Sequence, residues 1–227
     1  MAPERLFVAS ADGHVGIPTP EYRDYLDPEY REPFTGFLAE HIQRWSAAEP
    51  TSVLDPAAWD WWRGNERYEN GGIASLFDPE RRVKEIDHDG IGIEVLFADD
   101  QNENTAPWLG GGLVQVGLQK EYSSELRMAG ARAYNRWLAE FCSFAPDRHI
   151  GVIAIPTLED VDAAVAEVRR AHADGLHHSV LLPLDYEPLV HHPKNEPFWD
   201  VCSELDLTIA VHLGDCLLYT SPSPRDS

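Results

Sequence analysis

The feature that most constrains the fold is a regular alternation of short apolar segments with amphipathic segments of ten or more residues. From residue 78 onward the apolar segments have the length and composition of strands, and the amphipathic ones have helical spacing. Strands that are joined through helices pair in parallel, because a tight turn would reverse the chain. The pattern therefore predicts an α/β fold with a parallel sheet. The predicted strands are Leu6–His14, Ile91–Phe97, Ile150–Ile155, Ser179–Leu182 and Leu207–Leu213.

Helix boundaries are marked by capping residues and by proline. Asp78 and Pro79 begin a helix that Gly90 ends, and further helices are predicted over residues 119–144, 158–174 and 195–205. Residues 15–78, which interrupt this rhythm, are interpreted as an insertion after the first strand that folds over the mouth of a barrel. Both a (β/α)8 barrel and a doubly wound open sheet satisfy the local pattern. No Gly-x-Gly-x-x-Gly follows the first strand, which argues against a dinucleotide-binding form.

Two polar side chains close the first strand and suggest a metal site. Asp12 and His14 are two residues apart, so in an extended chain they point to the same side. In parallel α/β sheets the chemistry gathers at the carboxyl ends of the strands, and His212 lies at the end of the fifth predicted strand. Carboxylate and imidazole are common metal ligands, so Asp12, His14 and His212 are the predicted ligands, with a structural turn as the alternative for Asp12 and His14. Asp147 and His149 share the spacing but precede a strand, which favours a structural role.

Composition limits the partners of this chain. The net charge of −21 disfavours nucleic acid and anionic membranes, and 43% apolar residues with seven Trp indicate a folded globule. No apolar run reaches the length of about 20 residues that a membrane span needs, and no signal peptide precedes the first strand. Three scattered Cys form neither a disulfide framework nor a metal motif. We therefore expect a cytoplasmic protein.

Three side chains in loops are candidates for substrate contact, because loops at the mouth of a barrel carry specificity. They are Trp61, Trp108 and His192. A plain packing role is the alternative for each of them.

The last twelve residues, 216–227, break the pattern. They have neither helical nor strand periodicity, and the run resembles a translated sequencing adapter. We therefore predict a barrel domain over residues 1–215 and a non-native tail after it. On this interpretation a natural homologue continues past Asp215, because only five of the eight units of a closed barrel are present.

Several motifs together resemble the amidohydrolase-related family. This is the branch of the amidohydrolase superfamily that includes aminocarboxymuconate-semialdehyde decarboxylase and resorcylate-type decarboxylases. The motifs are Ser10–His14 with Pro18, Asp78–Arg82, Asp89–Ile91, Tyr134–Leu138, Ala145–Arg148, Pro197–Trp199 and His212–Gly214.

The resemblance implies a partial TIM (β/α)8 barrel with one divalent metal ion, for which zinc is the first expectation and manganese the alternative. Asp12 and His14 fall on the family's ligand pair after strand one, where His-x-His or Glu-x-His is usual, and His212 matches a third ligand. Asp12 departs from both usual forms. Its carboxylate oxygen is a harder ligand than an imidazole nitrogen, so it shifts the preference of the site toward harder metal ions. A fourth ligand and the catalytic acid or base are expected beyond residue 215.

Two reactions suit such a site, and the family contains both. A metal-activated water can hydrolyse a C–N or C–O bond of a small-molecule substrate. Alternatively, the metal can hold the oxygens of an aromatic or unsaturated carboxylic acid that loses CO₂. We lean slightly toward hydrolysis, with decarboxylation as its mechanistic equal. A third alternative is that this piece of the barrel is inactive and poorly soluble. Whether the full-length form is a homo-oligomer is left open.

Overall fold

The computed structural model describes residues 6–47, 72–98, 104–109, 122–183 and 189–212. Its centre is a five-stranded sheet in the order β1-β2-β3-β4-β5, and every neighbouring pair is parallel. The predicted α/β class, strand order and strand direction are therefore confirmed. The strands are β1 (Val8–Val15), β2 (Ile91–Ala98), β3 (His149–Ile153), β4 (Ser179–Leu181) and β5 (Thr208–Ala210).

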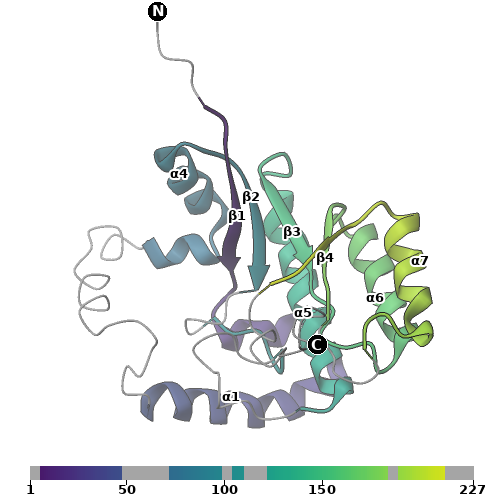
Figure 1. Ribbon diagram of the computed structural model, residues 1–227. Helices are drawn as coiled ribbons and strands as arrows, with labels where there is room; N and C mark the ends of the chain where they lie inside the picture. The colour runs from purple at the N-terminus through teal and green to yellow at the C-terminus, as the bar shows by residue number, and fades with distance from the viewer. Residues whose placement is uncertain (1–5, 48–71, 99–103, 110–121, 184–188, 213–227) are drawn as a thin grey trace, which may run out of the picture.

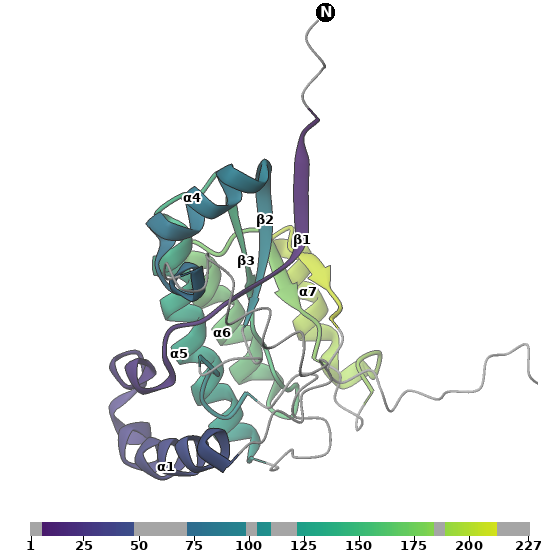
Figure 2. The same cartoon turned by 90° about the vertical axis from the view of Figure 1, so that its left-hand side faces the viewer.

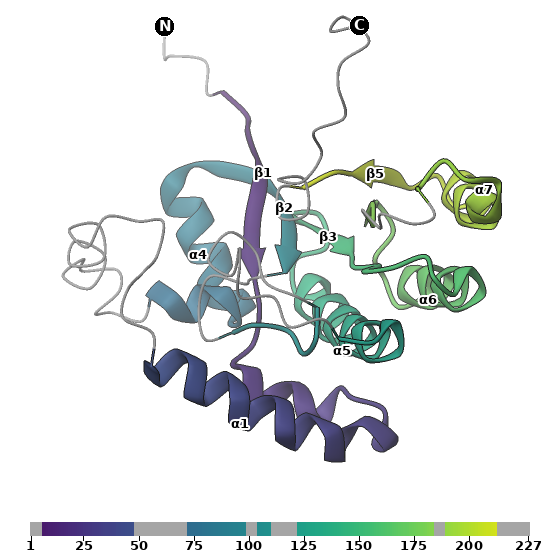
Figure 3. The same ribbon diagram turned by 60° about the horizontal axis from the view of Figure 1, so that its bottom comes forward.

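The sheet is curved, and the helices that connect its strands lie on its outer side (Figures 1 and 3). The arrangement is a half-barrel of βα units, as the partial (β/α)8 interpretation requires. The helices of this outer layer are α4 (Pro79–Asp89), α5 (Ser124–Ser143), α6 (Val161–Ala173) and α7 (Glu196–Glu204).

Side-chain caps set the helix boundaries. The Asp78 carboxylate accepts a hydrogen bond from the backbone N–H of Arg81, and Gly90 ends α4 with φ +75°, as predicted. Two predicted starts are wrong by a few residues. Ser123 caps α5 and Asp160 caps α6, so these helices begin at residues 124 and 161 instead of 119 and 158. In α6 the capping side chain outweighs the apolar Leu158 that precedes it, whereas the residues just before Ser123 are mostly polar.

The main core lies between the sheet and the outer helices. Buried aliphatic side chains of the strands meet buried side chains of α5, α6 and α7, and each contributes roughly 1.5–3 kcal/mol of stabilisation. The residues of this contact include Leu96, Ile153 and Val180 from the strands and Leu138, Val168 and Val201 from the helices.

The segment after β1 forms an aromatic extension of the core. It consists of the 3-10 helices η1 (Thr19–Asp24) and η2 (Pro28–Tyr30) and the helix α1 (Arg31–Ala47), which lies beyond the carboxyl ends of β1 and β2 (Figures 1 and 2). Phe34 and Phe37 stack at 5.9 Å between ring centroids, and both rings contact Trp108. These aromatic side chains therefore extend the main core beyond the ends of the strands.

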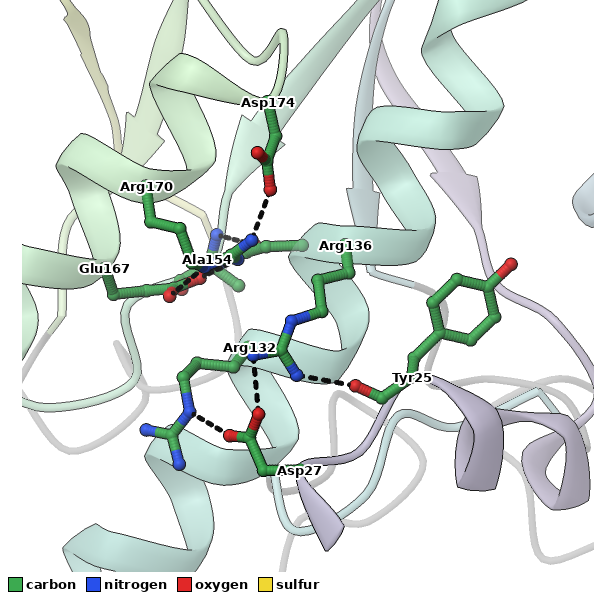
Figure 4. Close-up of polar contacts among 9 residues, drawn as sticks. Tyr25, Asp27, Arg132, Arg136, Ala154, Glu167, Arg170 and Asp174 are labelled. Carbon is green, nitrogen blue, oxygen red and sulfur yellow. Dashed lines mark hydrogen bonds and ion pairs between the residues drawn. The ribbon is translucent and has the colours of Figure 1, made fainter.

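Ion pairs fasten this segment to α5. Asp27 bridges two arginines of α5, accepting from Arg132 Nε at 2.9 Å and from Arg136 Nη2 at 2.6 Å (Figure 4). Arg136 also donates to the backbone carbonyl of Tyr25 at 2.7 Å. Because the three side chains are only partly exposed, the network fixes the position of the segment over the sheet.

A buried amide joins α5 to β3 and α6. The side chain of Asn135 accepts from Ala154 N at 2.8 Å and donates to Ala154 O at 3.1 Å, directly after β3. It also donates to Glu167 Oε1 at 2.7 Å, and Glu167 in turn accepts from Arg170 (Figure 4). No helix of the described residues is long and apolar enough to cross a membrane.

Loss of the Asn135 amide should destabilise the protein strongly. Asn135→Ala leaves the buried Ala154 N–H, its carbonyl and Glu167 without this partner, so we expect the free energy of unfolding to fall by about 2–4 kcal/mol in urea titrations. Ser143→Ala, at the exposed end of the same helix, is the control and should change it by less than about 0.5 kcal/mol. An equal effect of the two changes would contradict the role of Asn135.

A buried histidine should make stability fall in acid. His149, which stacks on Phe141, is 2% exposed, and neither ring nitrogen has a hydrogen-bond partner among the described residues. Burial lowers the pKa of His149 below its ordinary value of 6.5, although the nearby Glu94 carboxylate opposes this. Below pH 6.5 the unfolded chain therefore takes up a proton that the folded protein excludes, and the folded state loses stability.

His149→Phe removes this proton uptake. We expect the stability of the variant relative to wild type to improve as pH falls from about 7.5 to about 5.5, by at most about 1.4 kcal/mol per pH unit. Urea unfolding at the two pH values measures the difference. A stability difference that does not change with pH would show that His149 does not titrate in this way.

Candidate metal centre

Asp12 and His14 project from β1 on the side of the sheet that faces away from the helices. Between them, Gly13 is turned toward the helix layer, because a Cβ built there would meet Leu96 and Arg82. Alternation along a strand then places Asp12 and His14 on the concave face. The side chain of His14 is 19% exposed and that of Asp12 is 73% exposed.

A backbone carbonyl orients the His14 ring. Nδ1 of His14 lies 3.0 Å from the carbonyl oxygen of Ala98, at the end of the neighbouring β2. With Nδ1–H as the donor, Nε2 carries the free lone pair and faces Asp12 Oδ1 at 3.3 Å. Metal-bound imidazoles commonly use one nitrogen in this way to hold the ring while the other binds the ion.

His212 approaches the same carboxylate from the other edge of the sheet. It follows β5 by two residues, and its Nε2 lies 2.9 Å from Asp12 Oδ1. The rings of His14 and His212 meet edge to face at 5.2 Å, and Phe97 at the end of β2 packs on His212 at 4.5 Å. The ligand atoms of Asp12, His14 and His212 all lie within 4.8 Å of one another.

This proximity depends on the curvature of the sheet. β1 and β5 are the first and last of five strands, and four spacings of about 4.8 Å would separate them by roughly 19 Å in a flat sheet. The short contact between Asp12 and His212 therefore fits a closing barrel and excludes the doubly wound open sheet that the local sequence pattern allowed.

The two imidazoles also set the electrostatics of Asp12. The hydrogen bond from His212 lowers the pKa of the Asp12 carboxyl below its ordinary value of 3.8, partial burial opposes this, and the charges of His14 and His212 add to the lowering. Asp12 is therefore an anion near neutral pH and supplies the negative charge of the group.

The three side chains have the chemistry and spacing of a divalent-metal site. Ligand atoms bonded at about 2.0–2.2 Å with tetrahedral angles lie roughly 3.4 Å apart, close to the 3.3 and 2.9 Å measured from the Asp12 oxygen. The exposed side of Asp12 leaves space for a further ligand, as a catalytic site requires. That these residues bind a metal ion stays a prediction.

Of the three predicted substrate-contact residues, Trp108 and His192 belong to the described part of the chain. Trp108 is 2% exposed and packs against Phe34 and Phe37, so its contacts in this structure are those of a packing residue. His192 is exposed, and its Nδ1 accepts a hydrogen bond from the backbone N–H of Lys194 at the start of η5 (Pro193–Asn195). Trp61 falls outside the described residues.

Sequence reasoning missed three residues next to the site. Phe97 packs against both imidazoles, with its ring 6.2 Å from that of His14. Glu94 is 1% exposed on β2 and forms an ion pair with Arg82 of α4 behind β1. A signal was available for Glu94, because a charged residue inside the apolar run Ile91–Ala98 needs a buried partner.

Comparison with known proteins identifies relatives of this chain. Residues 84–226, more than half of the chain, match the family model described as amidohydrolase. The γ-resorcylate decarboxylase of Rhodococcus jostii (strain RHA1) is 36% identical over 153 residues, which are 63% of this chain and 44% of that protein. The chain thus spans less than half the length of this relative.

Solved structures of low sequence identity share the fold. An amidohydrolase from Mycobacterium avium subsp. paratuberculosis K-10 superposes with a TM-score of 0.62 at 19% identity, covering 93% of this chain and 60% of that one. A manganese-bound 5-carboxyvanillate decarboxylase from Novosphingobium aromaticivorans DSM 12444 gives 0.55 at 19% identity, covering 94% and 54%. A manganese-bound dihydroxybenzoic acid decarboxylase from Polaromonas sp. JS666 gives 0.53 at 20% identity, covering 97% and 51%.

Metal binding can be tested ligand by ligand. We expect the metal-free chain to bind one equivalent of Zn²⁺ or Mn²⁺ in calorimetric titrations, and His14→Ala or His212→Ala to weaken binding by at least about tenfold, which is about 1.4 kcal/mol. His178→Ala is the matched control, because this exposed histidine precedes β4 at the opposite end of the strands. Unchanged affinity in His212→Ala would remove His212 from the site.

Proposed function

The chain belongs to the amidohydrolase family of enzymes, and on this basis we propose that it carries the metal-binding part of a carboxy-lyase. The proposed reaction is the non-oxidative removal of CO₂ from a small hydroxylated aromatic carboxylic acid. The observation that supports it most is the 36% identity to a γ-resorcylate decarboxylase, together with three potential ligands that converge on one point.

Hydrolysis by a metal-activated water was favoured slightly by the sequence alone. The same ligands would serve either reaction, so the geometry of the site does not separate them. The similarity to a decarboxylase supports loss of CO₂ better, and hydrolysis becomes the second candidate.

Each residue of the site has a role in this proposal. Asp12 and the Nε2 atoms of His14 and His212 would hold one divalent ion, which would draw electron density from the substrate's oxygens. The Ala98 carbonyl keeps His14 in the tautomer that leaves Nε2 free. Phe97 covers the His212 ring, limiting its rotation and excluding water from that side of the site.

The identity of the ion is a finer part of the proposal. Zinc accepts one carboxylate and two imidazoles, and manganese suits the harder oxygen of Asp12. Two fold relatives were solved with manganese bound, so Mn²⁺ is the first ion to test beside Zn²⁺.

The reaction requires a bond change and a proton. The bond between the ring carbon and the carboxylate carbon breaks, CO₂ leaves, and the ring carbon takes up a proton. Asp12, His14 and His212 supply binding and charge for this step. We assign the proton donor to none of the described residues.

The proposed activity can be measured directly. We expect protein that contains this chain, loaded with Mn²⁺ or Zn²⁺, to release CO₂ from 2,6-dihydroxybenzoate. Chelation should abolish release and added metal should restore it. His14→Ala should lower the rate by at least about 100-fold, which corresponds to about 2.7 kcal/mol, and His178→Ala should leave it unchanged.

Two results would count against this assignment. Metal-dependent hydrolysis of amide or ester substrates without release of CO₂ would establish the second candidate instead. Release of CO₂ that persists in His14→Ala would show that the site described above is not the reacting centre.

A further inference from the structure

We infer that Arg82, held by the buried Glu94, is a positioning residue of the metal centre and supports the strand segment that carries Asp12 and His14. This inference rests on the proposed metal site. It concerns residues on the opposite face of β1, which contact neither the substrate nor the ion.

The first support is the buried ion pair itself. Glu94 Oε1 and Oε2 accept from Arg82 Nε at 2.9 and 3.1 Å, and Oε2 also accepts from Arg82 Nη2 at 2.7 Å. The side chains are 1% and 13% exposed. Removing both charges from water costs about as much as their attraction returns, so apolar residues of similar volume would stabilise the core at least as well. The pair is therefore better explained by the geometry that it imposes.

That geometry concerns the backbone of β1. Arg82 Nη1 donates to the backbone carbonyl of His14 at 3.4 Å. A Cβ at Gly13 would lie 3.0 Å from Arg82 Nη2 and 3.1 Å from the backbone oxygen of Val95. The chain between the two ligands thus runs directly against the guanidinium, and glycine is the residue that allows this approach.

An irregularity in the strand pairing lies at the same place. Ser10 pairs with Glu94 and Gly13 with Leu96, so three steps along β1 match two steps along β2. The extra residue is a β-bulge within the segment that contains Asp12, and such bulges redirect side chains near functional sites. Glu94 stands opposite the start of the bulge, and Arg82 contacts the backbone where the bulge ends.

The arrangement predicts a specific sensitivity. Lysine keeps the charge of Arg82 but cannot make the two-pronged contact with Glu94 and reach His14 O at the same time. Without that support, Asp12 and His14 can move relative to His212. Partners that orient metal ligands typically change metal affinity by 10- to 100-fold when they are replaced.

The matched control is Arg148→Lys. Arg148 also donates to backbone carbonyls of the β2 segment, those of Ile91 and Gly92, and it pairs with Asp87. Its contacts lie at the amino end of β2, far along the strand from Phe97 and Ala98. Arg148→Lys should therefore lower stability without moving the ligands, which separates positioning from a general structural role.

The experiment titrates wild-type chain, Arg82→Lys and Arg148→Lys with Mn²⁺, followed by the electron paramagnetic resonance signal of the free ion. Co²⁺ is added in parallel, because its visible absorption reports coordination geometry. We expect Arg82→Lys to raise the Mn²⁺ dissociation constant by about 10- to 100-fold and to alter the Co²⁺ spectrum. Arg148→Lys should leave the Mn²⁺ dissociation constant and the Co²⁺ spectrum unchanged, even where thermal unfolding shows that it loses as much stability as Arg82→Lys.

A second variant keeps the test decisive if Arg82→Lys fails to fold. Gly13→Ala retains the ion pair but pushes a methyl group against Arg82 and the Val95 carbonyl, so it should also weaken Mn²⁺ binding and alter the Co²⁺ spectrum. Wild-type affinity and spectrum in either folded variant would overturn the positioning role while leaving the proposed function intact. A wild-type chain that binds neither ion would instead overturn the metal site, and this inference with it.

Discussion

The curvature of the parallel sheet is the constraint on which the rest of the structure depends. It turns the first and last strands toward each other, so that Asp12 on β1 and His212 after β5 meet although 200 residues separate them. Apolar residues on the convex side pack under helices, while Asp12, His14 and His212 converge on the concave side beside Phe97. Fold and candidate site are thus two results of one geometric property.

Two pairs of buried polar groups lie on the helix side of the sheet, opposite the candidate site. Glu94 with Arg82, and Asn135 with Glu167, place charge or an amide where hydrophobic residues would pack at least as well. Each group contacts the backbone of a strand near its carboxyl end, either β1 or the residue after β3. Such contacts hold the strand backbone in a defined position at some cost in stability. A metal centre depends on that position more than a hydrophobic core does.

Most elements were predictable because their signals are local. Asp78 and Gly90 mark a helix through a side-chain acceptor and a left-handed backbone, and both act over a few residues. The errors at the starts of α5 and α6 arose because the predicted helices were extended past the true capping residues, Ser123 and Asp160. Trp108 was ambiguous for another reason: an aromatic side chain near a barrel mouth has the same local sequence whether it contacts substrate or packs on Phe34.

The sequence by itself determined the α/β class, the parallel strand order and three potential ligands. Strands and their carboxyl ends can be located from local periodicity, and functional side chains of parallel α/β sheets gather at those ends. Only the tertiary structure decided that the sheet curves, and therefore that His212 lies 2.9 Å from Asp12 instead of roughly 19 Å away. It also revealed Phe97, Glu94 and Arg82 around the ligands. Curvature and close packing arise from the fit of side chains that are distant in the chain, and no local pattern encodes that fit.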